Sequence, residues 1–428
     1  MAARLATTDP DFEARFTALL AAKRENAPDV DRAVRAIIAD VRARGDEALR
    51  DYTARFDGHQ PATLRVPAKT IEAAYAGARA EVLEALRLAR DRIDAYHRRQ
   101  LPADESHVDE LGVTLGWRWT PIESVGIYVP GGTASYPSSV LMNAIPAKVA
   151  GVGRLVMVVP TPQGMLNPLV LAAARLAGVD EIYCVGGAQA VAALAFGTET
   201  IAPVAKIVGP GNAYVAAAKR QVFGAVGIDM LAGPSEVLVV ADSENHPDWV
   251  AADLLAQAEH DSAAQAILIT DDRALADAVE EAVARQLKTL SRADTAAASW
   301  RDFGAIIEVG SLAEAGPLVD RLAPEHLELA TADPEALLQL VHNAGAIFLG
   351  RHTPEVIGDY VAGSNHVLPT ARWARFSSGL STPDFMKRSS LLKLDADSLR
   401  ALGPAAMILA EAEGFNAHAR SIAVRLNL

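Results

Sequence analysis

The sequence predicts an α/β fold with parallel sheets, arranged in two units. Short, continuously apolar segments alternate with Ala- and Leu-rich segments over most of the chain, as expected for strands that helices cover on both faces. An interruption of this alternation at residues 227–234 suggests two α/β units. The chain has 428 residues, and at about 100–200 residues per domain this length also indicates two or more domains.

Helices are predicted before the alternating region. Apolar residues recur at helical spacing between residues 29 and 56, and again between residues 69 and 99. The link between the two patterns begins with a turn at residues 57–61. Residues 111–120 then alternate as in an extended hairpin, and residues 125–132 predict a strand that runs into a Pro-Gly-Gly turn.

The alternating region and the tail predict different structures. The predicted strands are residues 154–159, 181–185, 206–208, 236–241, 265–270, 305–309 and 346–349. The predicted helices between them include residues 168–177, 190–196, 212–223, 246–261 and 273–288. In the tail, residues 375–379 and 384–388 predict loop and extended chain, and residues 404–426 predict one long helix. That helix carries Glu413 and His418 and could be an arm that reaches a neighbouring subunit, although a surface helix is the default.

Composition excludes several classes of protein. The hydrophobic content of 50% and the charged content of 22% are ordinary for a globular protein. The net charge of −13 argues against a nucleic-acid or anionic-membrane partner, since both require a basic face. The N-terminus lacks the apolar core of a signal peptide, and no segment reaches the roughly 18 apolar residues of a membrane span. We therefore expect a cytoplasmic protein with no membrane or nucleic-acid partner.

The single cysteine, Cys184, excludes an intrachain disulfide and a cysteine-rich metal site. Cys184 lies in an apolar predicted strand, whereas a reactive thiol needs partial exposure and positive surroundings. We therefore expect a core residue. This position counts against aldehyde oxidation through a cysteine thioester.

Two glycine-rich turns each precede a predicted helix. Residues 208–212, Val-Gly-Pro-Gly-Asn, follow an apolar strand, and Gly186-Gly187 precede Gln189. Free backbone N–H groups at such a helix start favour an anion such as a dinucleotide phosphate. Neither turn has the Gly-x-Gly-x-x-Gly pattern of a standard Rossmann site, and each alone is more often structural. Together with the Pro-Gly-Gly turn at Gly132, they support a nucleotide site and a structural role about equally.

Glu325 and His326 are adjacent titratable residues among apolar neighbours. They follow Pro324, which is placed to begin a turn or a helix. A histidine can act as a base near neutral pH, and a neighbouring carboxylate can tune it or act separately. The structural alternative is a turn whose glutamate pairs with an arginine. For an isolated Glu-His pair, the structural turn is the favoured interpretation.

A set of possible metal ligands is scattered along the chain. Gln257 and His260 share a face at the end of a predicted helix, although such residues more often lie on the surface or cap the helix. Asp359 lies in residues 353–370, a Pro- and Gly-rich loop of the kind that often carries function. With His418 they form an oxygen and nitrogen ligand set suited to zinc or a similar divalent ion. No spacing links them. Equally good sets include His342, His352 or His366.

Taken together, these segments resemble the histidinol dehydrogenase family over almost the full length of the chain. The motifs that carry the resemblance are long and specific. They are residues 126–133 (GIYVPGGT), 136–148 (YPSSVLMNAIPAK), 209–212 (GPGN), 229–236 (DMLAGPSE), 256–261 (AQAEHD), 323–327 (APEHL), 358–360 (GDY) and 413–419 (EGFNAHA). Two departures, Phe415 for the usual leucine and Ser135 for a frequent alanine, lie near positions with family roles and leave the chemistry intact.

The resemblance implies site residues that spacing does not. One zinc ion per subunit would have the ligands Gln257, His260, Asp359 and His418. The catalytic acid/base pair would be Glu325 and His326. The NAD contacts would be Tyr128, Gln189 and Asn212. The substrate contacts would be Ser235, Gln257, His260, His326, Asp359, Glu413 and His418.

The resemblance also implies an architecture. Two incomplete Rossmann-like domains with parallel sheets would be joined by small N-terminal and C-terminal helical or extended elements. The first domain would comprise residues 25–105 and 236–375, and the second residues 128–235. Residues 1–24 and 106–127 would form a small N-terminal and hairpin element. Residues 376–428 would be an arm that reaches the partner in an intertwined homodimer and places Glu413 and His418 in the partner's site.

The implied reaction is a four-electron oxidation in which L-histidinol, two NAD⁺ and water give L-histidine, the last step of histidine biosynthesis. His326 would take the hydroxyl proton in the first oxidation, bound histidinal would be the intermediate, and Glu325 would activate water for the second oxidation. Zinc would hold the substrate through its imidazole and amine nitrogens, which is a positioning role.

Two alternatives to this reaction remain. One is a dehydrogenase of the same architecture that acts on another small alcohol, such as a sulfonated diol. The presence of Glu413 and His418 disfavours it. The other is a non-catalytic zinc- or nucleotide-binding protein, which the intact pair of Glu325 and His326 disfavours.

Overall fold

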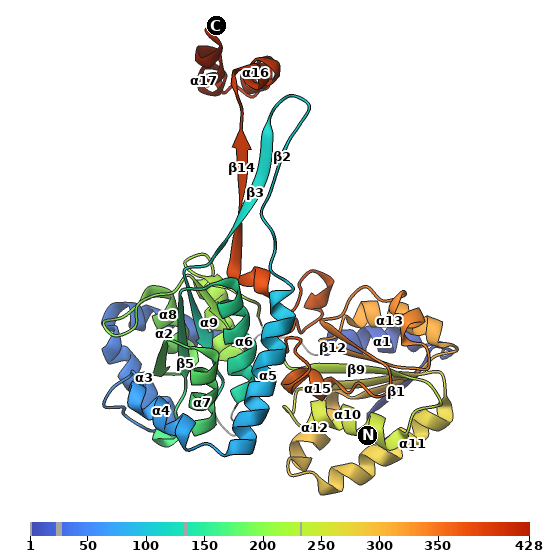
Figure 1. The fold of residues 1–428 in the computed structure, drawn as a ribbon. Helices are drawn as coiled ribbons and strands as arrows, with labels where there is room; N and C mark the ends of the chain where they lie inside the picture. The colour runs from blue at the N-terminus through green and yellow to red at the C-terminus, as the bar shows by residue number, and fades with distance from the viewer. Residues whose placement is uncertain (1, 23–27, 132–135, 232) are drawn as a thin grey trace.

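The computed structural model describes residues 2–22, 28–131, 136–231 and 233–428 and consists of two α/β domains and an extended arm (Figure 1). Each domain contains one parallel sheet, and the arm contains a smaller antiparallel sheet. The predicted α/β class with two units is confirmed. None of the helices in these described ranges is both long and apolar enough to cross a membrane.

The five-stranded sheet lies in the domain at the left of Figure 1. Its strands are parallel, in the order β6-β5-β4-β7-β8. Because alternate residues of a strand point to opposite faces, Val156 and Val158 pack with α8 and α9, while Leu155 and Met157 pack with α6 and α7. The elements are β4 (Ser124–Tyr128), β5 (Arg154–Val159), β6 (Glu181–Cys184), β7 (Lys206–Val208), β8 (Gly227–Ile228), α6 (Pro137–Ala150), α7 (Pro168–Ala177), α8 (Gly187–Phe196) and α9 (Ala213–Val222).

The six-stranded sheet forms the domain at the right of Figure 1. Its parallel strands have the order β1-β11-β10-β9-β12-β13. Val237 and Val239 pack with α10, α11 and α12, and Leu238 and Val240 pack with α1 and α13 on the other face. The elements are β1 (Ala3–Ala6), β9 (Glu236–Ala241), β10 (Gln265–Thr270), β11 (Ala305–Glu308), β12 (His326–Ala330), β13 (Ala346–Leu349), α1 (Phe12–Ala21), α10 (Pro247–Ala258), α11 (Arg273–Gln286), α12 (Ala293–Phe303), α13 (Ala315–Leu322) and α14 (Pro334–Leu338).

The two sheets share one topology. Apart from the edge strand β1, both have the strand order 3-2-1-4-5 when strands are counted along each domain. This is the Rossmann order without its last strand, so two incomplete Rossmann-like sheets are confirmed. The order reverses between β4 and β7 in one sheet and between β9 and β12 in the other. Ligands of open α/β sheets bind at the carboxyl ends of strands beside such a reversal.

The predicted domain boundaries differ from the observed packing in two places. The helices of residues 25–105 cover the five-stranded sheet instead of joining residues 236–375. Within the predicted element of residues 1–24, β1 pairs with β11 at the edge of the six-stranded sheet, so the described residues 2–22 do not form a separate element. Helical spacing defines an apolar stripe but not the sheet that the stripe packs against, so these placements depend on tertiary contacts. The helices concerned are α2 (Pro28–Arg44), α3 (Asp46–Asp57), α4 (Ala68–Ala76) and α5 (Ala80–Arg98).

Three local predictions are corrected. The segment after Pro324, predicted to begin a turn or a helix, forms β12, because its apolar residues are buried between β9 and β13. The tail helix is divided into α16 (Ala396–Ala412) and α17 (Asn416–Leu426), because Gly414, with φ of 78°, ends the first of them. The loop predicted at residues 353–370 contains a short helix, α15 (Glu355–Tyr360).

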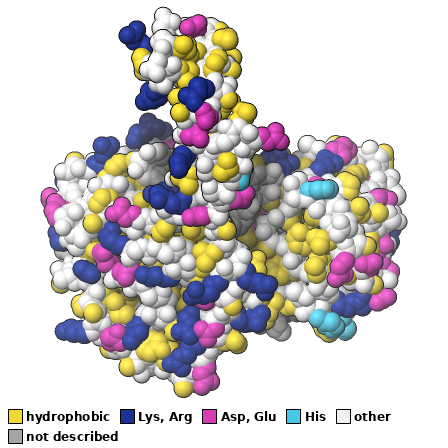
Figure 2. All heavy atoms as spheres, turned by 45° about the horizontal axis from the view of Figure 1, so that its top comes forward, with side chains coloured by type: hydrophobic (Ala, Val, Ile, Leu, Met, Phe, Trp, Pro, Cys, Tyr) yellow, Lys and Arg dark blue, Asp and Glu magenta, His cyan; other side chains and the backbone are white. Residues whose placement is uncertain are grey.

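The arm extends away from both domains (Figure 1). Strand β14 (Met386–Lys393) pairs with β3 (Thr114–Pro121), which pairs with β2 (Glu105–Val108), all antiparallel. Helices α16 and α17 lie at the far end, and Figure 2 shows hydrophobic side chains on the surface of the arm. Its large exposed apolar residues include Ile408, Leu409, Phe415 and Val424. Clustered exposed apolar residues of this kind mark a contact surface.

We predict that Phe385→Ala lowers the free energy of unfolding by about 3–5 kcal/mol, because Phe385 is fully buried at the base of the arm and its loss leaves a cavity. Phe376→Ala is the matched control. That ring is 68% exposed, so the change should be within about 0.5 kcal/mol. Denaturant unfolding monitored by circular dichroism measures both variants. Equal effects would show that Phe385 does not anchor the arm.

Candidate active site

The predicted catalytic pair lies at the amino-terminal edge of the six-stranded sheet. His326 begins β12, and Glu325 precedes it beside Glu236, the first residue of β9. The backbone N–H of Glu236 donates to Glu325 Oε2 over 2.9 Å, and the Glu236 carbonyl oxygen lies 3.0 Å from His326 Nδ1. Both side chains are buried. One residue of β9 therefore orients both of them.

The contact at Nδ1 determines how His326 can act. A carbonyl oxygen only accepts, so Nδ1 carries the hydrogen and Nε2 carries the lone pair of the neutral ring. Nε2 is buried and has no hydrogen-bond partner among the described residues. It lies 3.8 Å from Glu355 Oε2 and 3.8 Å from Asp359 Oδ1. The ring therefore presents a base to a space bounded by two carboxyl groups.

Helix α15 supplies both of these carboxyl groups. Glu355 and Asp359 are four residues apart, so they share one face of the helix. Together with His326 they offer ligand atoms that all lie within 4.8 Å of one another, as a shared metal ion requires. Glu355 is absent from the predicted site residues. Its helical spacing from Asp359 is the signal that could have indicated it.

Burial shifts the carboxyl groups behind this face toward their protonated forms. Burial raises the pKa of Glu355 to about 7, with His326 opposing the shift and Asp359 adding to it. Burial also raises the pKa of Asp253 to about 6 and that of Glu328 well above its usual range. Glu328 accepts the backbone N–H of Glu355 over 2.6 Å and is hydrogen-bonded to Asp253. A hydrogen bond between two carboxyl groups requires that one of them is protonated. Asp253 and Glu328 therefore carry less negative charge beside α15 than two ionised carboxylates would.

Gln257 and His260 lie at the C-terminal end of α10, which packs against α15. Gln257 is 1% exposed, and neither polar atom of its amide has a hydrogen-bond partner in the described part of the chain. An unsatisfied buried polar group costs about 1–3 kcal/mol, which a bound ion or ligand would offset. His260 interacts electrostatically with Asp359 and His326. The structure thus brings His260, which lies two residues after α10, close to Asp359 of α15, with Gln257 three residues before His260.

His366, an alternative ligand that the sequence left open, lies beside Asp359. Its Nδ1 is 3.1 Å from the Asp359 carbonyl oxygen and 3.9 Å from Asp359 Oδ1, and its Nε2 is 3.4 Å from Ser139 Oγ. Burial lowers the pKa of His366. Because Ser139 belongs to α6 of the other domain, His366 connects the two domains at the site.

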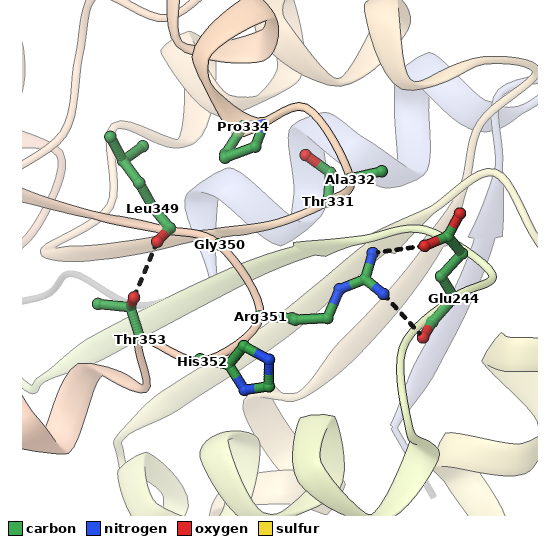
Figure 3. A pocket seen from close by; sticks show the side chains of 9 residues that line it. All are labelled: Glu244, Thr331, Ala332, Pro334, Leu349, Gly350, Arg351, His352 and Thr353. Atoms are coloured by element: carbon green, nitrogen blue, oxygen red, sulfur yellow. Dashed lines mark hydrogen bonds and ion pairs between the residues drawn. The ribbon is translucent and has the colours of Figure 1, made fainter.

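The other alternative histidines lie elsewhere. His342 Nδ1 is 2.9 Å from a carboxylate oxygen of Asp320 on the surface. His352 lines an open pocket of about 430 Å³ at the carboxyl-terminal edge of the six-stranded sheet (Figure 3). Arg351 pairs there with Glu244 (Figure 3). None of the predicted site residues lines this pocket.

The predicted NAD residues gather at the carboxyl-terminal edge of the five-stranded sheet. Tyr128 ends β4, Gln189 lies in the first turn of α8, and Asn212 caps α9. The Tyr128 hydroxyl accepts the backbone N–H of Gly187 over 3.0 Å, and burial raises the pKa of Tyr128 to about 12. The buried Oε1 of Gln189 has no hydrogen-bond partner within the described ranges. These residues flank the order reversal between β4 and β7, and the unpartnered oxygen fits a ligand there.

Two further sequence predictions for this region concern the Pro-Gly-Gly turn and Cys184. Gly132, which ends the Pro-Gly-Gly turn, and Ser135 lie outside the described residues. Cys184 ends β6, and burial raises the pKa of its thiol to about 11. A thiol with that pKa is almost entirely protonated near neutral pH, in agreement with the predicted unreactive cysteine.

The remaining predicted substrate residues are divided between the domain and the arm. Ser235 directly precedes β9, where its carbonyl oxygen accepts the N–H of Gln265 over 2.9 Å. Glu413 ends α16, and His418 lies in α17 with its ring 5.1 Å from that of Phe415. Both helices are at the far end of the arm (Figure 1). One chain therefore does not bring Glu413 and His418 to the other site residues.

Comparisons with known proteins identify the family. A family model described as histidinol dehydrogenase matches residues 20–426. The curated histidinol dehydrogenase of Rhizobium meliloti (strain 1021) is 69% identical over 430 residues, which cover 100% of this chain and 99% of the relative. That of Brucella suis biovar 1 (strain 1330) is 67% identical and is covered over its whole length. The crystal structure of histidinol dehydrogenase from Elizabethkingia anophelis matches with a TM-score of 0.95 at 37% identity, covering 100% of this chain and 98% of that chain. The chain therefore belongs to the histidinol dehydrogenase family of oxidoreductases.

Proposed function

We propose that the chain oxidises L-histidinol to L-histidine with two NAD⁺ and one zinc ion per active site. The observation that carries the proposal is the set of buried polar atoms without partners among the described residues, namely His326 Nε2 and both amide atoms of Gln257. In the proposed reaction, His326 Nε2 would be the base and Gln257 would be a metal ligand. The acidic surroundings, Glu355 and Asp359, suit a substrate that carries an amine. The relatives' name, histidinol dehydrogenase, supports the choice of alcohol.

The residues present fit a zinc ion. Gln257, His260 and Asp359 offer the oxygen and nitrogen atoms that zinc accepts. His326 is not assigned to the ion, although it lies close to Asp359, because its Nε2 must keep the lone pair to accept a proton. When bound, zinc would hold the imidazole and amine nitrogens of the substrate, and NAD⁺ would accept a hydride in each oxidation.

His326 and Glu325 divide the proton transfers. In the first oxidation, Nε2 of His326 accepts the hydroxyl proton, and the carboxyl groups 3.8 Å away stabilise the imidazolium. In the second, Glu325 removes a proton from the water that adds to the bound aldehyde. The resulting hydrate is oxidised to the carboxylate. This route requires no thiol, which is consistent with the partly buried Cys184 and the raised pKa of its thiol.

The proposed assembly is a homodimer in which the arm of each chain completes the site of the other. His418 would supply the fourth zinc ligand, and Glu413 would contact the substrate. The remote position of both residues in one chain and the exposed apolar residues of α16 and α17 support this arrangement. A biosynthetic enzyme that draws on free NAD⁺ is expected in the cytoplasm.

Purified protein loaded with zinc should form two NADH for each L-histidine produced from L-histidinol. A chelator should abolish this activity and added zinc should restore it, because the metal ligands hold the substrate through the ion. NADH absorbance and amino-acid analysis give the ratio. Protein that binds zinc and NAD⁺ but turns over only another small alcohol, such as a sulfonated diol, would contradict the substrate assignment.

Glu325→Gln should slow the oxidation of histidinal about 10²- to 10⁴-fold, the usual contribution of a general base, and slow the oxidation of histidinol much less. Glutamine keeps an oxygen that can accept the Glu236 N–H, so the position of the side chain is preserved. Supplying histidinol and histidinal separately measures the two half-reactions. His326→Asn is the control, since it should impair histidinol oxidation. Equal losses in both half-reactions of Glu325→Gln would contradict the division of roles.

A further inference from the structure

Residues 209–212 form the turn that joins β7 to α9 at the proposed nucleotide site. Gly209 adopts φ of 105°, and an added Cβ would lie 2.2 Å from the carbonyl oxygen of Tyr128. Only glycine tolerates this close approach with that backbone conformation. Asn212 accepts two backbone N–H groups from the first turn of α9. The conformation at Gly209 therefore determines where the start of α9 lies relative to β4.

Lys219 and Asp229 hold both backbone polar groups of Gly209. The Nζ of Lys219 donates to the Gly209 carbonyl oxygen over 3.0 Å, and Asp229 Oδ2 accepts the Gly209 N–H over 2.8 Å. The two side chains also form an ion pair with each other. Lys219 belongs to α9, whereas Asp229 follows β8. Three segments of the domain thus meet at one glycine.

The ion pair is buried, with side chains 3% and 1% exposed. Transfer of charges out of water costs several kcal/mol per ion, so an apolar pair of similar volume is often equally or more stable. Val208, Val222 and Val226, which are close to the pair in sequence, are buried and apolar. Stability alone therefore does not account for a charged pair at this place. The two hydrogen bonds to Gly209 indicate instead that the pair holds the backbone of this glycine in place.

We propose that Lys219 and Asp229 are positioning residues for NAD⁺, which fix the backbone of Gly209 and through it the start of α9. The inference rests on the proposed NAD⁺ site. Both side chains are buried behind the turn and need not touch the nucleotide. Their loss should weaken NAD⁺ binding and leave the histidinol contacts and the catalytic pair of the other domain unchanged.

The test replaces both members of the pair together, Lys219→Met with Asp229→Leu, so that no single buried charge destabilises the fold. The KM for NAD⁺ should rise about 10- to 100-fold, because a displaced turn weakens the backbone hydrogen bonds to the nucleotide. The KM for L-histidinol, and kcat at saturating NAD⁺, should stay close to those of the parent protein. Arg154→Met is the matched control. It breaks the ion pair with Glu181 at the amino-terminal edge of the same sheet and should leave the KM for NAD⁺ unchanged.

A second measurement needs no nucleotide. Hydrogen exchange at residues 209–214 of the NAD⁺-free protein should be faster in the double variant and unchanged in Arg154→Met. Failure of the parent protein to bind NAD⁺ would refute the proposed function, and the exchange rates would still decide whether the pair fixes the turn. A folded double variant with an unchanged KM for NAD⁺ and unchanged exchange would overturn the inference. A double variant that unfolds while Arg154→Met stays folded would also overturn it, because the pair would then be required for folding.

Discussion

Two hydrogen bonds from the backbone of Glu236 orient Glu325 and His326, and they exist because β9 and β12 are paired neighbours in the sheet. The Glu236 side chain in turn accepts the N–H of Ala371 over 3.1 Å. Ala371 and the next residue adopt φ of 57° and 63°, a left-handed conformation that persists only where surrounding contacts enforce it. Strand pairing, the catalytic pair and the strained segment at Ala371 are therefore linked through a single residue.

The two sheets have the same strand order, but the predicted site residues lie at different edges of them. In the five-stranded sheet, Tyr128, Gln189 and Asn212 lie at the carboxyl-terminal edge, beside the order reversal where Rossmann-like sheets bind nucleotides. In the six-stranded sheet, the proposed catalytic pair of Glu325 and His326 lies at the amino-terminal edge. Its carboxyl-terminal edge holds the pair of Arg351 and Glu244 (Figure 3). Under the proposed function, one topology would therefore serve two tasks. His366 and Ser139 are in contact where the domains meet.

The sequence predicts the strands of the alternating region well, because short, continuous apolar runs such as residues 154–159 and 236–241 are typical of strands buried on both faces. It does not predict β12, whose start at His326 lies in a segment with turn-like residues. It also cannot assign α2 to α5 to a sheet, because an amphipathic helix pattern does not specify its partner.

The candidate site shows the same limit, namely that a sequence pattern does not specify which distant segments pack together. Gln257 and His260 are recognisable as a pair from helical spacing, but the interaction of His260 with Asp359 depends on the packing of α10 against α15. No local pattern specifies such a contact between distant segments. Glu355 is missed for a different reason, since its loop was predicted without the short helix that places it beside Asp359. The family resemblance supplies the remaining assignments, and Glu413 and His418 are the ones that a single chain leaves apart.

The most direct test is therefore whether residues of two chains form one active site. His326→Asn and His418→Asn should each be inactive alone. After subunit exchange, a mixed dimer would have one site with both substitutions and one site with neither, so about a quarter of the parent activity should return in an equal mixture. Recovery of activity would place His326 and His418 of different chains in one site. No recovery, with mixed dimers demonstrated by mass spectrometry, would contradict the shared site.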